Sequence, residues 1–532
     1  MSSQSRRFCC AGGRDNHGNP VAIANATSIT YDLCLHACGS GSAPFSWSAF
    51  SQQFSAWLLP WLALLSQFPF GSRYKWDNLM SAILALGSPC LATYSLTLTV
   101  LNKNWLTRRF ASIKYPNSRY AALVLSSLQQ IPLKVTTEGG LLASLVVLPE
   151  NDSWWTDLVD RLDYADLNTW SIAAATSIAW VVISYLVTIV DAFTSISSDP
   201  NNDLQAFAGA GSVWLWMIPL TITYLQTSPR CDSERVPTAL NRANEITFVA
   251  GPNGVVKAEQ VNEMRALSLH PERQSLYSDQ EATAPIYAYA RFFSFGKVVE
   301  EFVSAFEYAN QNSKARQPVD PTAIWEPGDG KSVDAANRRG TADQVEAYCS
   351  APAYVRRSHW GPDALSRFCI ASLAALALQW STTGASVVIV YFTPTIGVGC
   401  GSLTFLIYGA VATLIWATLV LSSILTHYAS YHEFRSFSHR AAAYASVFLR
   451  RLAKFLATLN AALIIGVFLL RFGNFFNRCY CNSNVISLGK MAHDVIVLGA
   501  GDLTAMRTSW TGGVALAVVS CVFYLGFINI LT

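Results

Sequence analysis

Long apolar stretches, almost none of which carries a charge in its middle, constrain this chain more than any other feature of its sequence. One of them, residues 170–190, contains no Asp, Glu, Lys or Arg. A helix rises about 1.5 Å per residue, so roughly 20 such residues span the hydrocarbon core of about 30 Å. Inside lipid, each backbone amide must be satisfied within its own segment, so these stretches are predicted to be helices. The chain is only 13% charged, against roughly 25% for an average soluble domain.

About eight stretches of this kind form two groups of about four. They lie at about residues 54–70, 79–101, 170–190 and 206–226, and at about 368–391, 402–426, 452–470 and 512–531. We therefore predict an all-α membrane protein, a polytopic bundle of about eight (7–8) transmembrane helices with a mixed cytoplasmic domain in the middle.

The polar sequence between these stretches suggests four parts of the chain. They are a Cys-containing N-terminal segment (1–52), a first transmembrane group (53–226), a cytoplasmic domain (227–367) and a second transmembrane group (368–532). Within the first group, residues 119–148 are interrupted by Pro132 and by Gly139 and Gly140. We expect that piece to lie at the membrane interface or to be buried against the bundle, rather than to span the membrane.

Basic residues near the span ends predict the orientation. Clusters follow the second span (Arg108, Arg109), precede the fifth and follow the sixth, whereas the connection 392–401 has no charge. The central domain is therefore predicted to be cytoplasmic, and the loop 471–511 is predicted to be outside.

The N-terminal segment gives conflicting signals. Eight spans with this orientation put it in the cytoplasm, with Asn25 unglycosylated and Cys34 and Cys38 reduced. Yet closely spaced cysteines and the sequon Asn25-Ala-Thr27 are typical of an extracellular segment. Alternatively, residues 54–70, interrupted by Pro60, enter and leave on one face, which leaves seven spans and an outside N-terminus. We expect a crossing, because a re-entrant path must bury irregular backbone among other helices.

Several stretches carry a resemblance to known sequences. They are residues 45–61, 87–102, 231–235 (Cys-Asp-Ser-Glu-Arg), 379–384 (Gln-Trp-Ser-Thr-Thr-Gly) and 392–394 (Phe-Thr-Pro). On these residues the chain resembles uncharacterised multipass membrane proteins of filamentous fungi over most of its length. The resemblance implies a fungal origin and a membrane location. No activity is attached to that family, so it implies no functional residues.

Few polar residues lie deep in the predicted spans, and Gln379 and Asn460 are the main ones. An intramembrane ionisable group would suggest a functional site, but these two are neutral. We expect them to form interhelical hydrogen bonds rather than a substrate site.

Cysteines in two predicted outer loops suggest a disulfide. Cys400 follows the fifth span, and Cys479 and Cys481 follow the seventh. Because disulfides persist outside the cytoplasm, we predict a bridge from Cys400 to one of the other two; the alternative is unpaired thiols.

A basic segment follows the sixth span. It is predicted to be an amphipathic helix on the inner leaflet whose cations contact anionic lipid headgroups. These cations are Arg435, Arg440, Arg450, Arg451 and Lys454.

Two partial motifs do not support an enzyme. The stretch 328–332 ends like a phosphate-binding loop, but Trp325 stands where that motif needs a glycine. His432 and Glu433 begin a zinc-protease motif, but Ser436 stands where the second histidine belongs. We predict no catalytic, cofactor-binding or metal-binding residue.

The predicted function is that of a non-enzymatic membrane protein, an interaction or sensor protein, with the bilayer, anionic headgroups and a cytoplasmic protein as partners. A net charge of +3 gives no reason to expect nucleic acid. A transporter or channel is the alternative, because segments broken at Pro60, Pro89 and Pro219 could line a cavity. We expect the plasma membrane rather than an internal membrane.

Overall fold

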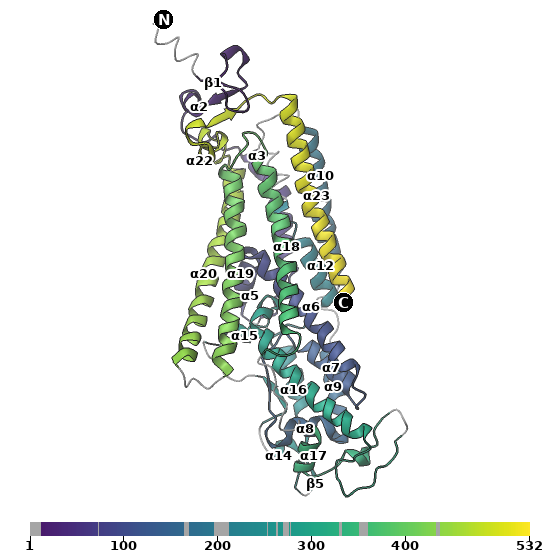
Figure 1. Ribbon diagram of the computed structural model, residues 1–532. Coiled ribbons are helices and arrows are strands. Elements are labelled where there is room, and N and C mark those ends of the chain that lie inside the picture. The colour runs from purple at the N-terminus through teal and green to yellow at the C-terminus, as the bar shows by residue number, and fades with distance from the viewer. Residues whose placement is uncertain are drawn as a thin grey trace.

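The computed structural model has three regions along one long axis (Figure 1). It describes residues 12–532 except 73, 164–169, 196–211, 253, 262–263, 270–275, 277, 329–331, 351–359 and 432–436. Long helices form a bundle in the middle. At the end nearer the N-terminus lies a small unit, here called the disulfide cap (residues 12–46, 392–399 and 473–499). At the other end lies a larger unit, the polar domain (residues 103–162 and 230–349).

Five long apolar helices dominate the bundle: α10 (Ile172–Ser195), α18 (Ala364–Tyr391), α19 (Cys400–Tyr431), α20 (Phe437–Phe472) and α23 (Ala500–Leu531). Their most apolar windows have mean hydropathies between 1.5 and 2.4. Large apolar side chains such as Trp180, Val187 and Phe523 point outward, and each is at least 62% exposed. Outward apolar faces on helices of this length are consistent with a membrane protein.

The other three predicted spans are not single long helices. In their place stand α3 (Trp47–Gln53), a π-helical turn (Phe54–Leu58), α4 (Leu59–Leu65), α5 (Lys75–Gly87), α6 (Pro89–Ala111) and α12 (Met217–Thr227). Among the described residues, five helices are long and apolar enough to cross a membrane, or six if the bent pair α5 and α6 is one span. The structure therefore supports the helical class but not a count of seven or eight.

The segment with Pro60 is helical through the proline. The helix runs from Trp47 to Leu65. In its π turn the N–H of Leu59 donates a hydrogen bond to the carbonyl of Phe54, five residues earlier. Proline lacks an N–H and its ring crowds the preceding turn, and a wider turn before it relieves that crowding.

The predicted span 79–101 is not one continuous helix but two, separated by a break at Ser88. Helices α5 and α6 meet at 107°. Between them Ser88 has φ −148° and ψ 87°, because the ring of Pro89 disfavours the helical conformation in the residue before it. The Ser88 hydroxyl then caps α6 by accepting the N–H of Leu91 at 3.2 Å.

The polar domain has its own apolar core. Trp154 and Trp155 on α9 and Phe302 and Phe306 on α16 are almost completely buried in it. Its elements are α7 (Ser118–Ser127), β3 (Leu133–Val135), η3 (Glu138–Gly140), α8 (Leu141–Val147), η4 (Pro149–Asn151), α9 (Asp152–Leu162), α13 (Arg235–Asn244), β4 (Phe248–Gly251), β5 (Gly254–Lys257), α14 (Ala258–Val261), β6 (Leu267–Leu269), α15 (Ser278–Glu281), η5 (Pro285–Tyr287), α16 (Ala288–Lys314), η6 (Ala335–Arg338) and α17 (Ala342–Cys349).

Residues 119–148, expected at the membrane interface or against the bundle, pack into this core instead. Strand β3 pairs antiparallel with β6, with Leu133 opposite Leu269. The predicted boundary at residue 227 thus separates two parts of the chain that fold together, because their apolar faces cover each other.

The disulfide cap joins distant parts of the chain. Its elements are β1 (Gly13–Arg14), η1 (Ile23–Asn25), β2 (Ser28–Thr30), α2 (Tyr31–Cys38), α21 (Cys479–Asn482), α22 (Val485–Leu488), η7 (Gly489–Met491) and β7 (His493–Val495). The three strands form one antiparallel sheet in the order β1-β2-β7. Two disulfides, Cys34–Cys479 and Cys400–Cys481, stabilise the cap.

The Cys34–Cys479 bond corrects the prediction for the N-terminus. Cys34 was expected to be reduced, on the opposite side of the membrane from the loop 471–511, but it is bonded to that loop. The prediction of a cytoplasmic N-terminus counted residues 79–101 as one membrane crossing. Because the helix is broken at Ser88, that crossing can no longer be assumed.

Candidate functional site: a buried charge cluster

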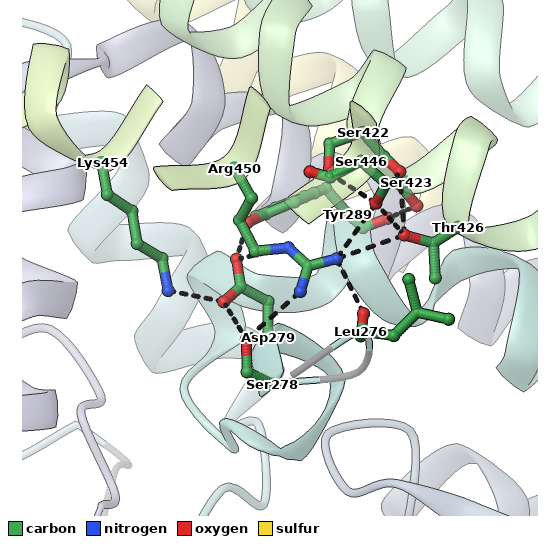
Figure 2. Close-up of polar contacts among 10 residues, drawn as sticks. All are labelled: Leu276, Ser278, Asp279, Tyr289, Ser422, Ser423, Thr426, Ser446, Arg450 and Lys454. Carbon is green, nitrogen blue, oxygen red and sulfur yellow. Dashed lines mark hydrogen bonds and ion pairs between the residues drawn. The ribbon is translucent and has the colours of Figure 1, made fainter. Parts of the chain in front are cut away.

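Three charged side chains meet where the bundle joins the polar domain (Figure 2). Asp279 on α15 is 1% exposed and lies between two cations of α20. Lys454 Nζ is 2.5 Å from Asp279 Oδ1, and Arg450 Nε is 3.7 Å from Asp279 Oδ2. We call these three residues the charge cluster. One carboxylate faces two cations, so the cluster is positively charged overall.

A tyrosine links the carboxylate to two more helices. The hydroxyl of Tyr289, at the start of α16, donates to Asp279 Oδ2 at 2.5 Å. The hydroxyl of Ser423 on α19 donates to the main-chain carbonyl of Tyr289 at 2.9 Å. Helices α15, α16, α19 and α20 therefore meet at one polar junction.

The Arg450 guanidinium has acceptors on both sides of the junction. It donates to the carbonyl of Leu276 at 2.8 Å and to the hydroxyl of Ser278 at 3.2 Å, both in the polar domain. It also donates to Thr426 Oγ1 at 3.2 Å and to Ser446 Oγ at 3.4 Å, both in the bundle. A buried arginine is tolerated only when its charge and its N–H groups are matched in this way.

The charge cluster corrects part of the predicted inner-leaflet patch. Arg440 and Arg451 are exposed, and Arg435 lies outside the described residues. The Arg450 side chain is only 8% exposed, so it cannot contact headgroups as predicted. Lys454 also turns inward, because the carboxylate of Asp279 provides it with an anionic partner inside the protein.

Part of this site could have been found from the sequence. Ser446, Arg450 and Lys454 are spaced by four, as are Ser422 and Thr426, and such spacing puts polar groups on one helix face. The acidic partner carries no such signal, because Asp279 stands 175 positions before Lys454 in a segment of ordinary polar sequence.

Two further arginines are buried at the same junction. Arg367, at the start of α18, donates to Asn102 Oδ1 at 2.5 Å and lies 3.8 Å from the centre of the Trp105 ring. Arg291 donates to Gln130 Oε1 at 2.7 Å, and Gln130 Nε2 in turn donates to Thr99 Oγ1, in the bundle part of α6, at 3.2 Å. Together with the charge cluster, these contacts attach the polar domain to the bundle through buried polar groups.

The predicted polar pair, Gln379 and Asn460, lies at the break between α5 and α6. Gln379 on α18 accepts the N–H of Cys90 at 2.9 Å and donates to Gly409 on α19 at 2.9 Å. Asn460 on α20 donates to the carbonyls of Gly87 at 2.8 Å and Tyr408 at 3.1 Å. Both side chains make interhelical hydrogen bonds, and both are at most 2% exposed.

Hydrogen bonds and one close backbone contact fix the break between α5 and α6 against the neighbouring helices. The Tyr408 hydroxyl donates to the carbonyl of Leu86 at 2.8 Å, and the Ser88 hydroxyl donates to the carbonyl of Ala412 at 2.7 Å. At Gly87 a Cβ atom would lie 2.4 Å from the carbonyl oxygen of Ala457, so only glycine permits this approach. The backbone groups released by the break are thus bonded to α18, α19 and α20, which apolar surroundings require.

The predicted cysteines lie together where the disulfide cap meets the first residue of α19. Cys400 is bonded to Cys481, while Cys479 is bonded to Cys34. The sulfur of Cys38 lies within 4.8 Å of the sulfurs of Cys34 and Cys479. Because the other two are bonded to each other, this group offers one thiol and is no set of metal ligands.

No protein family, curated protein or solved structure matches this chain. The resemblance to fungal membrane proteins stays a prediction.

Proposed function

We propose that this protein is a non-enzymatic membrane protein of the interaction or sensor class, whose polar domain engages a protein partner according to the state of the helix bundle. The charge cluster is the observation that carries the proposal. It makes the position of the polar domain against α20 depend on one buried set of ion pairs, Asp279 with Arg450 and Lys454. Removing one member of such a set costs about 3–5 kcal/mol, enough to shift a two-state equilibrium almost completely from one state to the other.

Two helices that pass through both cores support this coupling. Helix α6 contributes Leu98 to the bundle core and Phe110 to the core of the polar domain. Helix α16 contributes Phe292 to the bundle core and Phe302 to the polar domain. A continuous helix transmits tilt along its length, so a movement in one core reaches the other.

The proposal includes a topology of seven crossings. The helix from Trp47 to Leu65 begins beside the end of α20, with the rings of Phe50 and Phe472 6.3 Å apart. It is followed by Gly71, whose carbonyl accepts the N–H of Ser233 in the polar domain at 3.0 Å. This helix and the segment 212–227 would add two crossings to the five long helices.

In this topology α5 and α6 form a re-entrant hairpin. The chain before α5 is held at the polar domain through Gly71, and α6 ends in the polar domain core at Phe110. The turn at Ser88 instead contacts Ala412, in the middle of α19. Both arms would therefore start from the same side of the membrane. The seven-span alternative considered from the sequence had residues 54–70 re-entering; we propose that residues 75–111 do so instead.

The orientation follows from the basic residues and the disulfides. Basic residues such as Arg108 and Arg109 stand at the polar-domain end of the bundle, which supports a cytoplasmic position for that domain. The opposite end carries the two disulfides, which persist outside it. Exposed Arg451 would meet the anionic inner leaflet, and we propose the plasma membrane as the location.

Proximity labelling from a tag on the polar domain tests the function. The variants are Asp279→Asn and Lys454→Gln in the charge cluster, with Arg451→Gln on the exposed face of the same helix as the matched control. We expect both cluster variants to change the set of labelled cytoplasmic neighbours at equal membrane levels, and the control to leave it unchanged. An identical set in all four proteins would overturn the proposal.

A transporter is the second candidate, and the break at Ser88 favours it, because broken helices line the substrate sites of many transporters. Here the side chains of Gln379 and Asn460 form hydrogen bonds with the released backbone groups. Those groups are therefore not left open for a substrate. Purified protein in sealed vesicles, tested with a panel of ions and metabolites, decides between the two. A flux that the wild-type protein supports and the Gln379→Leu variant does not would favour a transporter over a sensor.

A further inference from the structure

The sequon Asn25-Ala-Thr27 lies on the surface of the disulfide cap. Asn25 ends the short helix η1 and is exposed, and its main-chain N–H is bonded to the carbonyl of Ala22 at 2.8 Å. Two residues later, the Thr27 carbonyl accepts the N–H groups of Ile496 and Val497 at 3.0 and 2.9 Å. The sequon is therefore held on a fixed turn at the edge of the sheet, with the asparagine side chain directed away from the core.

The compartment is indicated by covalent bonds in the same unit. Cys34, which forms the disulfide with Cys479, lies nine positions after Asn25. Disulfides form in the oxidising lumen of the secretory pathway, and N-linked glycans are added to Asn-X-Ser/Thr in that same compartment. The two chemistries thus require the same side of the membrane.

We propose that Asn25 is an N-glycosylation site, an inference that rests on the orientation proposed above. The donor is a lipid-linked oligosaccharide pyrophosphate. Asn25 Nδ2 forms a bond to the anomeric carbon of the oligosaccharide while the bond from that carbon to the phosphate oxygen breaks. The lipid pyrophosphate leaves with the electron pair, and the amide loses one proton.

A second sequon, Asn151-Asp-Ser153, provides an internal comparison. Asn151 is 0% exposed at the centre of the polar domain. Its Nδ2 donates to the carbonyls of Ser144 at 2.8 Å and Phe248 at 2.9 Å. The same orientation puts this sequon in the cytoplasm, so we expect it to carry no glycan. The chain therefore contains one accessible sequon and one buried sequon at opposite ends of the bundle.

The test uses the full-length protein from native membranes, treated with a glycosidase and compared by gel mobility. Asn25→Gln and Thr27→Val remove the first sequon, and Thr27→Ser restores it with the other accepted residue. Ser153→Ala removes the second sequon by changing an exposed side chain. In parallel, an epitope tag inserted after Gly41, an exposed glycine of the cap, is stained on intact and on permeabilised cells.

We expect a mobility shift in wild type, Thr27→Ser and Ser153→Ala, and none in Asn25→Gln or Thr27→Val. No shift, with the tag stained on intact cells, would overturn the glycosylation site and leave the orientation standing. No shift, with the tag stained only after permeabilisation, or a shift lost in Ser153→Ala, would overturn the orientation together with the site.

Discussion

The two ends of helices α19 and α20 are held by different kinds of bond. At the cap end, Cys400, the first residue of α19, is bonded covalently to Cys481, beyond the end of α20. At the other end, Arg450 and Lys454 of α20 hold the polar domain through the carboxylate of Asp279. The first attachment is covalent and is broken by reductant, whereas the second depends on the charges of side chains that are largely buried.

The difference reflects the size of the units at each end. The cap is short and has little apolar interior, and small units of that kind depend on disulfides. The polar domain buries Trp154, Trp155, Phe302 and Phe306 and keeps Cys349 as a buried free thiol. A unit with that much apolar core needs no covalent bond, so its junction with the bundle can be polar and adjustable.

The largest expected effect is at the charge cluster. Asp279→Asn leaves Arg450 and Lys454 without a carboxylate, and we expect it to destabilise the junction by about 3–5 kcal/mol. Hydrogen exchange of purified protein should show faster exchange in α15 and the first half of α20, with the cap unchanged. Asp160→Asn, on the exposed face of α9, is the control. If α15 and α20 exchanged at the wild-type rate in Asp279→Asn, the charge cluster would contribute nothing to the attachment of the polar domain to the bundle.

Next comes the loss of a disulfide. Cys400→Ser opens a loop between positions separated by 81 residues, and we expect the cap to lose about 2–5 kcal/mol. Alkylation without reductant followed by peptide mapping should find one new thiol, at Cys481. A new thiol at Cys479 instead would contradict the pairing. Cys349→Ala in the polar domain is the control and should leave exchange in the cap unchanged.

A smaller effect is expected between the two ends, where neutral hydrogen bonds hold the break. Asn460→Leu leaves the carbonyls of Gly87 and Tyr408 without their donor, at a cost of about 1–3 kcal/mol. Thermal unfolding in detergent measures it, with the exposed Asn529→Leu as the control. Equal melting temperatures for the two variants would show that the break is not stabilised by Asn460.

The smallest effect is a pH dependence of the cap. Burial raises the pKa of Asp494 to about 6, while nearby His493 opposes the shift. Since the folded pKa lies above the unfolded value of about 3.9, the folded cap binds more protons. Its stability is therefore highest below about pH 4 and falls as the pH rises through about 6. Solvent screening of this partly exposed carboxylate reduces the fall from the full linkage value to roughly 1–2 kcal/mol. Asp494→Asn should abolish the slope in cap hydrogen exchange; a wild-type profile without that slope would contradict the assignment.

The sequence by itself determined the five long helices. Apolar runs such as 170–190 and 402–426 are helical wherever they lie in lipid, because each amide must find its partner four residues away. It also marked Gln379 and Asn460 as polar groups in apolar helices, since their surroundings are visible in the local sequence.

Only the tertiary structure decided the partners. Asp279 with Lys454, Cys34 with Cys479 and Gln379 with Cys90 are pairs separated by 175, 445 and 289 positions. Local sequence carries no record of contacts at such distances. The break at Ser88 depends on both local and distant residues. Pro89 favours a bend through local sterics. The backbone groups that the bend releases can be buried only because side chains and carbonyls from three other helices bond to this region.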